Sequence, residues 1–328
     1  MSGQYRIFGS EMSPYSVKVR SWFRFKGISH QWIARGPANE DEFKKYARLP
    51  IVPMVVTPED QGIQDSTPII EAVDPLCPEP SIHPASPALN FLSALLEEFG
   101  DEWGNKLMFH HRWFAPVDQQ ASALTLAHLN MPGAPPEQIE GLAGMILGRM
   151  STRGHFVGSS PENAPLITAY YQELLDLLQA HLATRKYLFG ARPGFGDFGL
   201  AAQLYEASVD PTCGAIMMGR APDVLAWCHR MMEPRLDGEF ETWASLQPTL
   251  APIIAYVGRY FLPWTKANAK ALEAGEEIFS VDLPGGVYVQ PPQKYHARSL
   301  TALRAKYEAV KSDPELAAIL EAAGCDLS

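Results

Sequence analysis

Basic residues are scarce in this 328-residue chain, in which 27 Lys and Arg stand against 37 Asp and Glu for a formal charge of −10. A net acidic chain without a basic block is not expected to bind nucleic acid or an anionic membrane as its main partner. The chain contains no stretch of 18 uninterrupted apolar residues, and its most apolar long segment, 250–264, contains Arg259. No membrane-spanning helix is therefore predicted.

Cysteine is rare as well, and the four that occur (Cys77, Cys213, Cys228 and Cys325) are widely scattered. Because there is no CxxC pair and no Cys/His cluster, we expect no metal site and a set of reduced thiols, as in a cytoplasmic protein. The opening MSGQYRIFGS has no basic stretch followed by an apolar one, so no secretory signal is expected. With 46% apolar residues, the length predicts about two globular domains.

The first eighty residues alternate between strand and helix signals. Residues 5–8, 30–34, 51–56 and 63–64 are typical of strands, and helices are expected from Ser13-Pro14, over 41–48 and from Asp65-Ser66-Thr67-Pro68. Pro53 inside a β-type run indicates an edge or a bend, with a cis Val52–Pro53 bond as one form of it. The order β-α-β-α-β-β-α predicts a small mixed sheet.

This order of motifs resembles the thioredoxin-like domain of glutathione transferases. The resemblance rests on Ser13-Pro14-Tyr15-Ser16 opening a helix, Val52-Pro53 before a hairpin and Asp65-Ser66 opening the last helix. It is greater to the serine- and cysteine-type classes, such as omega and tau, than to the tyrosine classes. It implies glutathione as co-substrate, a small hydrophobic electrophile as second substrate, and a homodimer in the cytoplasm.

The resemblance assigns a role to each motif. Ser13 would be the catalytic residue, donating a hydrogen bond to the glutathione sulfur and keeping it anionic at the helix N-terminus. Val52 and Pro53 would present main-chain groups to the cysteinyl part of glutathione. Asp65 would hold the γ-glutamyl ammonium, often together with the partner subunit, and Ser66 the γ-glutamyl carboxylate.

Simpler interpretations stay open at each position. Ser13 and the Asp65-Ser66 pair are also ordinary helix caps, and Ser10 and Ser16, with Tyr15 a weaker candidate, are alternative partners for the sulfur. The Asn-Pro-x-Gly stretch of the family is absent before Val52. We therefore name Lys45 and Arg48 only as candidate contacts of the glycyl carboxylate, because charged side chains on a helix more often face solvent.

The serines also exclude one activity. Glutaredoxins carry Cys-Pro-Tyr-Cys where this chain has Ser13-Pro14-Tyr15-Ser16. Hydroxyls cannot form mixed disulfides, so this motif cannot perform thiol–disulfide exchange.

Beyond the proline-rich stretch 75–87, helical patterns dominate. We expect an N-terminal glutathione-binding domain over 1–76, a linker over 77–87, a helical domain over 88–247 and an extension over 248–328 with a helix, a β-hairpin and terminal helices. Asp197, near the start of a helix that resembles the buried sixth helix of the family, is expected to serve folding. Its capping box is incomplete, because Gly194 stands at the cap position.

The helical part offers few residues with an assignable chemistry. His110 and His111 are expected to pack in the core or to line a pocket rather than to bind metal. By family analogy, Met12, Trp113 and Phe114 are candidates for an apolar acceptor pocket.

The predicted fold class is a thioredoxin-like α/β domain followed by an all-helical domain with an extension. The predicted function is a glutathione transferase that acts by conjugation, ether cleavage or dehalogenation. The alternative is a non-catalytic interaction or scaffold protein of the same fold.

Overall fold

The computed structural model describes residues 3–327, and its N-terminal part is a small sheet with helices on its faces. Its elements are β1 (Tyr5–Gly9), α1 (Pro14–Phe25), β2 (His30–Ala34), α2 (Glu40–Tyr46), β3 (Met54–Val56), β4 (Gly62–Gln64) and α3 (Ser66–Val73). The strand order is β2-β1-β3-β4, with β1 parallel to β2 and antiparallel to β3. This is the expected mixed sheet.

One predicted strand is shorter than expected. Of the run 51–56 only Met54–Val56 pairs in the sheet, while Ile51 to Pro53 form a bend with a cis Val52–Pro53 bond. Proline has no N–H to donate to a ladder, which explains why pairing starts after Pro53. The bend leaves residues 51–53 at the end of the sheet, next to the start of α3.

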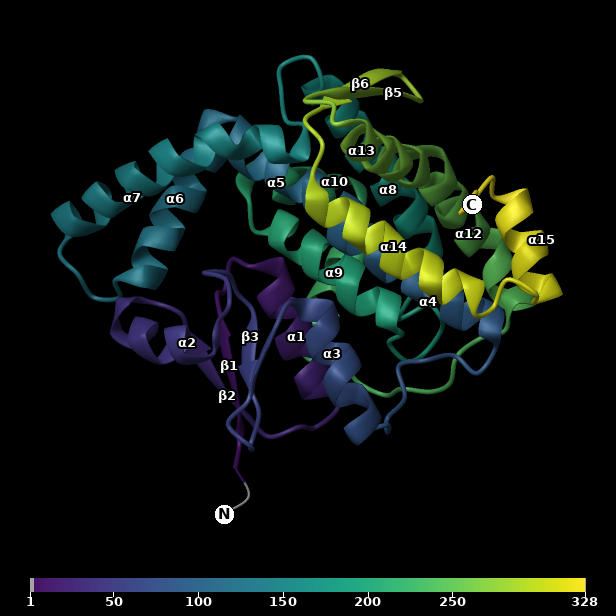
Figure 1. Cartoon of the computed structure of the whole chain (residues 1–328), viewed down its shortest axis with the longest axis horizontal. Helices are drawn as coiled ribbons and strands as arrows, with labels where there is room; N and C mark the ends of the chain where they lie inside the picture. Colours follow the sequence, from purple (N-terminus) through teal and green to yellow (C-terminus); the bar gives the residue numbers. More distant parts are fainter. Residues whose placement is uncertain (1–2, 328) are drawn as a thin grey trace.

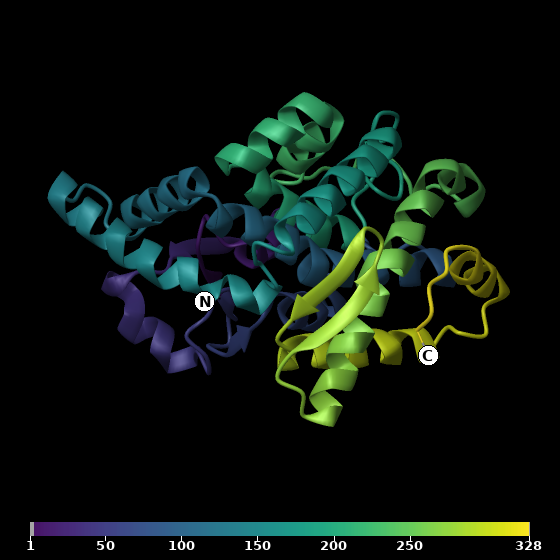
Figure 2. The same cartoon turned by 90° about the horizontal axis from the view of Figure 1, so that it is seen from above.

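The remainder of the chain is mostly helical, and Figures 1 and 2 show it packed beside the sheet. Its elements are α4 (Pro87–Phe99), α5 (Asn105–Phe114), α6 (Pro116–Asn130), α7 (Pro136–Met150), α8 (Ala164–Leu182), α9 (Phe195–Ser208), α10 (Pro211–Arg220), α11 (Pro222–Arg230), α12 (Trp243–Tyr256), α13 (Leu262–Ala274), β5 (Phe279–Leu283), β6 (Gly286–Gln290), α14 (Lys294–Glu308) and α15 (Pro314–Ala322). The predicted fold class is confirmed.

Helix α9 forms the centre of the helical part. Nearly every residue of α9 is buried, and α4 and α1 pack against it. Asp197 in its first turn is fully buried and accepts from the main-chain N–H groups of Leu188 and Gly194 and from the indole of Trp227, at 2.8–2.9 Å. A buried carboxylate with three donors serves folding, as expected.

The last eighty residues bring the chain back beside its N-terminal domain. The predicted hairpin is present as β5 and β6, and after it α14 lies along α4 (Figure 1). Its first turn reaches the start of α3, where the Tyr295 hydroxyl contacts Asp65. The C-terminal segment therefore borders the N-terminal sheet domain.

None of the helices within residues 3–327 combines the length and the apolar character needed to cross a bilayer.

Candidate functional site

A hollow of about 190 Å³ lies where the starts of α1, α3 and α14 meet the bend before β3. It is lined by Tyr15, Ile51, Val52, Pro53, Asp65 and Tyr295. Three of the sequence-predicted residues (Val52, Pro53 and Asp65) thus border one hollow, although they come from two different loops. Their gathering is the structural basis for a ligand site here.

The bend at Val52–Pro53 is held by its neighbours. The Asp65 N–H donates to the Pro53 carbonyl (3.3 Å), which joins the bend to the start of α3. The Gln64 amide donates to the carbonyls of Leu49 and Ile51 at 2.6 and 2.8 Å. Gln64, which sequence reasoning did not single out, therefore fixes the wall of the hollow formed by the chain before Pro53.

Asp65 has an unusual backbone conformation. Its φ is 82° and its ψ 138°, a region that residues with a side chain rarely adopt and that costs about 1–3 kcal/mol. One carboxylate oxygen, Oδ1, accepts from the Ser66 N–H (2.8 Å), and the other, Oδ2, accepts from the Tyr295 hydroxyl (3.0 Å). Backbone strain of this kind clusters at binding sites, and here it brings the carboxylate to the hollow.

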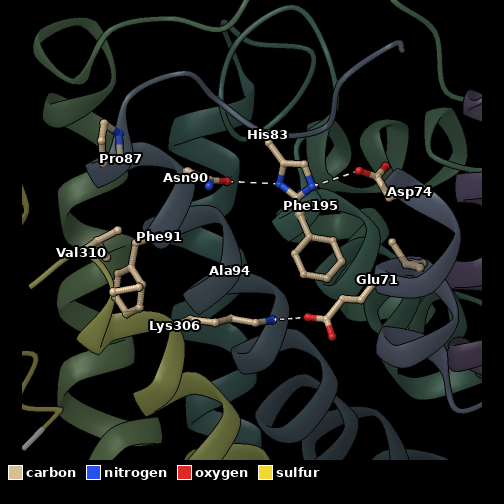
Figure 3. Close-up of a pocket in the computed structure, with 12 residues that line it drawn as sticks. Glu71, Asp74, His83, Pro87, Asn90, Phe91, Ala94, Phe195, Lys306 and Val310 are labelled. Atoms are coloured by element: carbon tan, nitrogen blue, oxygen red, sulfur yellow. Dashed lines mark hydrogen bonds and ion pairs between the residues drawn. The ribbon is translucent and has the colours of Figure 1, made fainter. Parts of the chain in front are cut away.

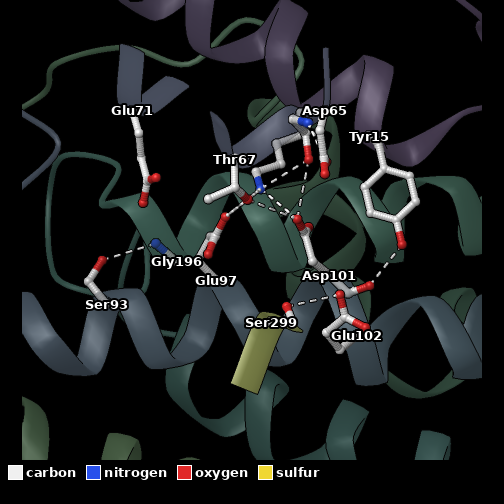
Figure 4. Close-up of polar contacts among 12 residues, drawn as sticks. Tyr15, Asp65, Thr67, Glu71, Ser93, Glu97, Asp101, Glu102, Gly196 and Ser299 are labelled. Atoms are coloured by element: carbon white, nitrogen blue, oxygen red, sulfur yellow. Dashed lines mark hydrogen bonds and ion pairs between the residues drawn. The ribbon is translucent and has the colours of Figure 1, made fainter. Parts of the chain in front are cut away.

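Ser66 lies behind Asp65, in a buried polar network. Its hydroxyl contacts Asp101 Oδ2 (3.3 Å) and the Lys18 ammonium (3.4 Å). The Lys18 ammonium also reaches Asp101 Oδ2 (2.6 Å), Glu97 Oε1 (2.5 Å) and the Thr67 hydroxyl (2.9 Å). Figure 4 shows Glu97, Asp101 and Thr67 turned toward one point between α3 and α4. The Ser66 side chain thus ties α1 and α3 to the turn Gly100–Gly104, which follows α4, beneath the hollow.

The network holds more carboxyls than cations. Burial raises the pKa of Asp101 to about 7 although Lys18 lowers it, and burial raises the pKa of Glu102 to about 8. Burial disfavours the Lys18 ammonium, but Asp101 and Glu97 outweigh it and raise the pKa of Lys18. The floor of the site is therefore acidic, with a lysine that stays charged and carboxyls that titrate near neutral pH.

Ser13 caps α1 as expected. It has an extended backbone conformation, and its Oγ accepts from the Ser16 N–H (3.3 Å), which leaves the hydroxyl proton free to donate to another group. Ser13 and Ser10 are half-buried. The Ser16 hydroxyl is fully buried and has no hydrogen-bond partner among the described residues, 3–327.

The Tyr15 hydroxyl is already engaged in a hydrogen bond outside the hollow. Its hydroxyl donates to the Asp101 carbonyl (2.9 Å), and burial raises its pKa well above the ordinary value. Tyr15 therefore lines the hollow as a fixed neutral ring rather than as a group that activates a sulfur.

Arg112 fixes the loop before Ser13 and was not singled out from the sequence. It is buried and donates to the Met12 carbonyl (3.0 Å), Glu206 Oε2 (2.9 Å) and Asp210 Oδ2 (2.8 Å). The β1–α1 loop is thereby attached to α5 and α9. A charged residue in the sequence His111-Arg112-Trp113 offers no local sign of this role.

The three residues predicted for an acceptor pocket do not surround one hollow of the described structure. Met12 is half-buried, Trp113 is buried against Phe109, and Phe114 is 40% exposed. Phe114 faces a separate hollow of about 460 Å³, shared with His110 and His111. Successive side chains on a helix point about 100° apart, which separates Trp113 from Phe114.

The two histidines make ordinary structural contacts. His110 Nδ1 lies 2.7 Å from the Ser159 hydroxyl, and His111 Nδ1 lies 2.8 Å from the Leu107 carbonyl. Burial lowers the pKa of His110 to about 3, so this ring is neutral. Within residues 3–327, no three His, Cys, Asp or Glu side chains are grouped so that they could hold a metal ion.

Lys45 and Arg48 are both exposed, and neither lines the hollow beside Val52. The Arg48 main-chain N–H donates to the Gln64 amide oxygen (3.0 Å).

A second hollow, of about 320 Å³, lies between α3, α4 and α14 (Figure 3). Phe91 and Phe195 form part of its wall, and Lys306 of α14 pairs with Glu71 of α3 at 2.7 Å. This ion pair attaches the C-terminal end of α14 to α3. The N-terminal end of α14 contacts the start of α3 through Tyr295 and Asp65.

Comparison with known proteins gives matches to the two domains of one family. Residues 12–76 match the model of the glutathione S-transferase N-terminal domain, and residues 161–230 match that of the C-terminal domain. No curated protein sequence matches the chain. The two matches follow each other in the order of the two domains of a glutathione S-transferase, so the chain is similar to this superfamily over residues 12–76 and 161–230, and the matches support glutathione transferase activity in general. Both models describe the superfamily, so the omega- or tau-like character stays a prediction.

Several solved structures are similar to the chain. A glutathione S-transferase from Rhodospirillum rubrum F11 is 19% identical, with 69% of this chain and 86% of that chain covered and a TM-score of 0.42. One from Methylobacillus flagellatus KT, solved with glutathione bound, is 17% identical (70% and 95% covered, TM-score 0.42). A glutathione transferase from Phanerochaete chrysosporium is 17% identical (71% and 98% covered, TM-score 0.46).

Proposed function

We propose that the chain binds glutathione in the hollow beside Val52, Pro53 and Asp65 and holds its sulfur as a thiolate over the start of α1, for attack on a hydrophobic electrophile. The observation that carries the proposal is the convergence of the cis Val52–Pro53 bend and the strained Asp65 on one hollow. Glutathione, with a cationic amino end and a peptide backbone, matches an acidic side chain beside exposed main chain.

Ser13 would supply the activation. A free thiol has a pKa near 8.5, so only about 3% is ionised at pH 7. The N-terminus of a twelve-residue helix favours a nearby anion, and the Ser13 hydroxyl proton is available because its oxygen serves as the acceptor for Ser16. Together they would lower the pKa of the bound thiol.

The charged groups of glutathione would be held by different parts of the chain. Asp65 would bind the γ-glutamyl ammonium, and the first turn of α3 would face the γ-glutamyl carboxylate. The Ser66 hydroxyl would support this turn from the buried network rather than meet the ligand directly. Lys45 and Arg48 stay candidates for the glycyl carboxylate, and Met12, one residue before Ser13, stays a candidate contact of the acceptor.

The further predictions of the resemblance are part of this proposal. They are a domain division at 1–76, 77–87, 88–247 and 248–328, a homodimer, and a cytoplasmic location. The four cysteines are free thiols in the structure, as such a location would require.

The test is Ser13→Ala. The ultraviolet absorption of the bound thiolate, titrated against pH, should show a raised thiol pKa, and conjugation of a model electrophile should slow by about tenfold or more, as when a donor to a reacting anion is removed. Ser13→Thr, which keeps a hydroxyl, should restore much of the activity.

Ser86→Ala is the matched control, because Ser86 caps α4 in the same way, accepting from the Leu89 N–H at 3.3 Å. Both alanine variants should lose about 1 kcal/mol of stability from the missing cap, but only Ser13→Ala should lose rate. An unchanged thiol pKa in Ser13→Ala would remove Ser13 from the mechanism. Absence of any calorimetric heat with millimolar glutathione would favour the scaffold function instead.

A further inference from the structure

Tyr295 brings a residue of the C-terminal segment into the glutathione site. It stands in the first turn of α14, and its hydroxyl donates to Asp65 Oδ2 at 3.0 Å. Its ring lines the same hollow as Tyr15 and Val52. A residue 230 positions along the chain from Asp65 thus forms part of the proposed binding site.

The helix that carries Tyr295 is fixed at both ends. Just before it, Gln293 exchanges two hydrogen bonds with the Asn268 amide, at 2.7 and 3.0 Å. His296 and Ser299 both contact the Glu102 carboxylate. Further along, Leu300 and Leu303 are buried, and Lys306 pairs with Glu71. The position of Tyr295 is therefore set by packing and does not depend on the contact with Asp65.

The Asp65 carboxylate keeps room for a ligand. Its two oxygens offer about four acceptor positions, of which the Ser66 N–H and the Tyr295 hydroxyl take two. The Tyr295 oxygen, while donating to Asp65, can also accept from a second donor. An ammonium group placed between Asp65 and Tyr295 would meet two acceptors.

The charges around Tyr295 favour a cation in this place. Burial, and after it the carboxylates of Asp65 and Glu102, raise the pKa of the Tyr295 hydroxyl. The hydroxyl therefore stays protonated at any pH at which the enzyme would work, and it remains a donor to Asp65. The Asp65 carboxylate, which borders the hollow, would attract an ammonium group.

We infer that Tyr295 is a positioning residue for the γ-glutamyl amino group of glutathione, orienting Asp65 and offering its own oxygen to the ammonium. The inference rests on the proposed function. It differs from what the family resemblance implies for Asp65, because the second contribution comes from the C-terminal segment of the same chain rather than from a partner subunit. It assigns a role to α14, which the sequence left without one.

Tyr295→Phe removes the hydroxyl and keeps the ring. With glutathione, we expect the KM and the calorimetric Kd to rise about tenfold, as for the loss of a hydrogen bond to a charged group, and kcat to change less than twofold. With the des-amino analogue, glutaryl-cysteinyl-glycine, which has no ammonium, wild type and variant should bind alike. The wild-type preference for glutathione over this analogue should therefore shrink in the variant.

Two further variants separate this role from a structural one. Tyr307→Phe removes a hydroxyl from the same helix, at a ring that packs against Phe91, and should leave both ligands unaffected. In an Asp65→Asn background, Tyr295→Phe should have little further effect, because the two groups act on one ammonium.

Each contrary result has a distinct meaning. An unchanged or lowered KM in Tyr295→Phe would overturn the inference, since a lowered value would mean that the hydroxyl competes with the ligand. An equal loss for glutathione and its des-amino analogue would also overturn it and leave Tyr295 a packing residue. Failure of the wild type to bind glutathione at all would overturn the proposed function, and the role of Tyr295 with it.

Discussion

Arg112 shows how one buried cation sets the position of the proposed catalytic loop. Its guanidinium joins Met12, one residue before Ser13, to two carboxylates of the helical domain. Burial raises the pKa of Glu206 to about 7 even with Arg112 beside it, so this carboxylate depends on its cation. The position of Ser13 therefore depends on an ion pair outside the hollow.

Arg112→Met should be strongly destabilising. It leaves Glu206 and Asp210 buried without their partner, a change that costs about 3–5 kcal/mol, and urea unfolding would measure the loss. Lys186→Ala, which breaks an exposed pair with Asp237, should cost about 1 kcal/mol or less. Equal losses in the two variants would contradict a special role for the buried pair.

The residues of the site differ in how far the sequence could predict them. Ser13, Pro53 and Asp65 stand next to local signals, a cap before proline or a proline inside a strand, and those signals act within a few residues. Tyr295, Arg112 and Lys18 act across gaps of 48 to 230 positions. No local pattern encodes such a contact, because it exists only once the helices have packed.

At the scale of elements, the close approach of α4 and α9 depends on glycine. A Cβ added to Gly100, where α4 runs into the π-helical turn Gly100–Gly104, would lie 2.5 Å from the main-chain nitrogen of Leu200. Because main chain cannot move aside as a side chain can, this position excludes every larger residue. Helix α4 and the turn Gly100–Gly104 also carry Glu97 and Asp101, the acids beneath the hollow, so the same contact supports the site.

Gly100→Ala should therefore destabilise the protein by about 1–3 kcal/mol or more, the usual cost of overpacking. Gly144→Ala is the matched control, because Gly144 lies inside α7 with open space around its added Cβ. That variant should gain about 0.5–1 kcal/mol from the better helix propensity of alanine. Thermal unfolding of both proteins would decide, and stabilisation by Gly100→Ala would contradict the packing described here.

Elements with strong local signals were predicted well, and their boundaries less so. The run 279–289, with Pro284-Gly285-Gly286 at its turn, predicted the hairpin β5–β6, because the signals for the turn and the strands are local. The helical pattern of the domain predicted over 88–247 did not show that the turn Gly100–Gly104 is π-helical. That change of geometry arises where α4 meets α9, which is a tertiary cause.

At the scale of the whole molecule, burial gives the chain two opposed sets of titrating groups. It raises the pKa values of Asp101, Asp197 and Glu206 to about 7 and that of Glu102 to about 8. It lowers the pKa values of His111, of His110 and His296 (to about 3) and of His181 (to about 4). Between about pH 4 and 6.5, the folded state holds extra protons on the carboxyls and the unfolded state holds extra protons on the histidines, so the two sets oppose each other.

Above about pH 6.5 the histidines no longer offset the carboxyls, and the free energy of unfolding should fall. The histidines are then neutral in both states, while the carboxyls are ionised in the unfolded chain and still partly protonated in the folded one. Each proton held only by the folded state lowers the unfolding free energy by about 1.4 kcal/mol per pH unit. Burial lowers the pKa of Lys106 and opposes this with one proton, whereas burial also raises the pKa values of Glu98 and Asp210 and adds to the effect of the four carboxyls.

Urea unfolding at intervals from pH 5.5 to 8.5 would measure this effect. We expect a nearly level unfolding free energy up to about pH 6.5 and a decline from there to about pH 8. Glu102→Gln removes the carboxyl with the highest of the four pKa values while keeping its shape, so its decline above pH 7 should be shallower than that of the wild type. A free energy that stays level or rises over this range would mean that these carboxyls are already ionised in the folded protein, and the acidic floor of the proposed glutathione site would then carry its full negative charge at neutral pH.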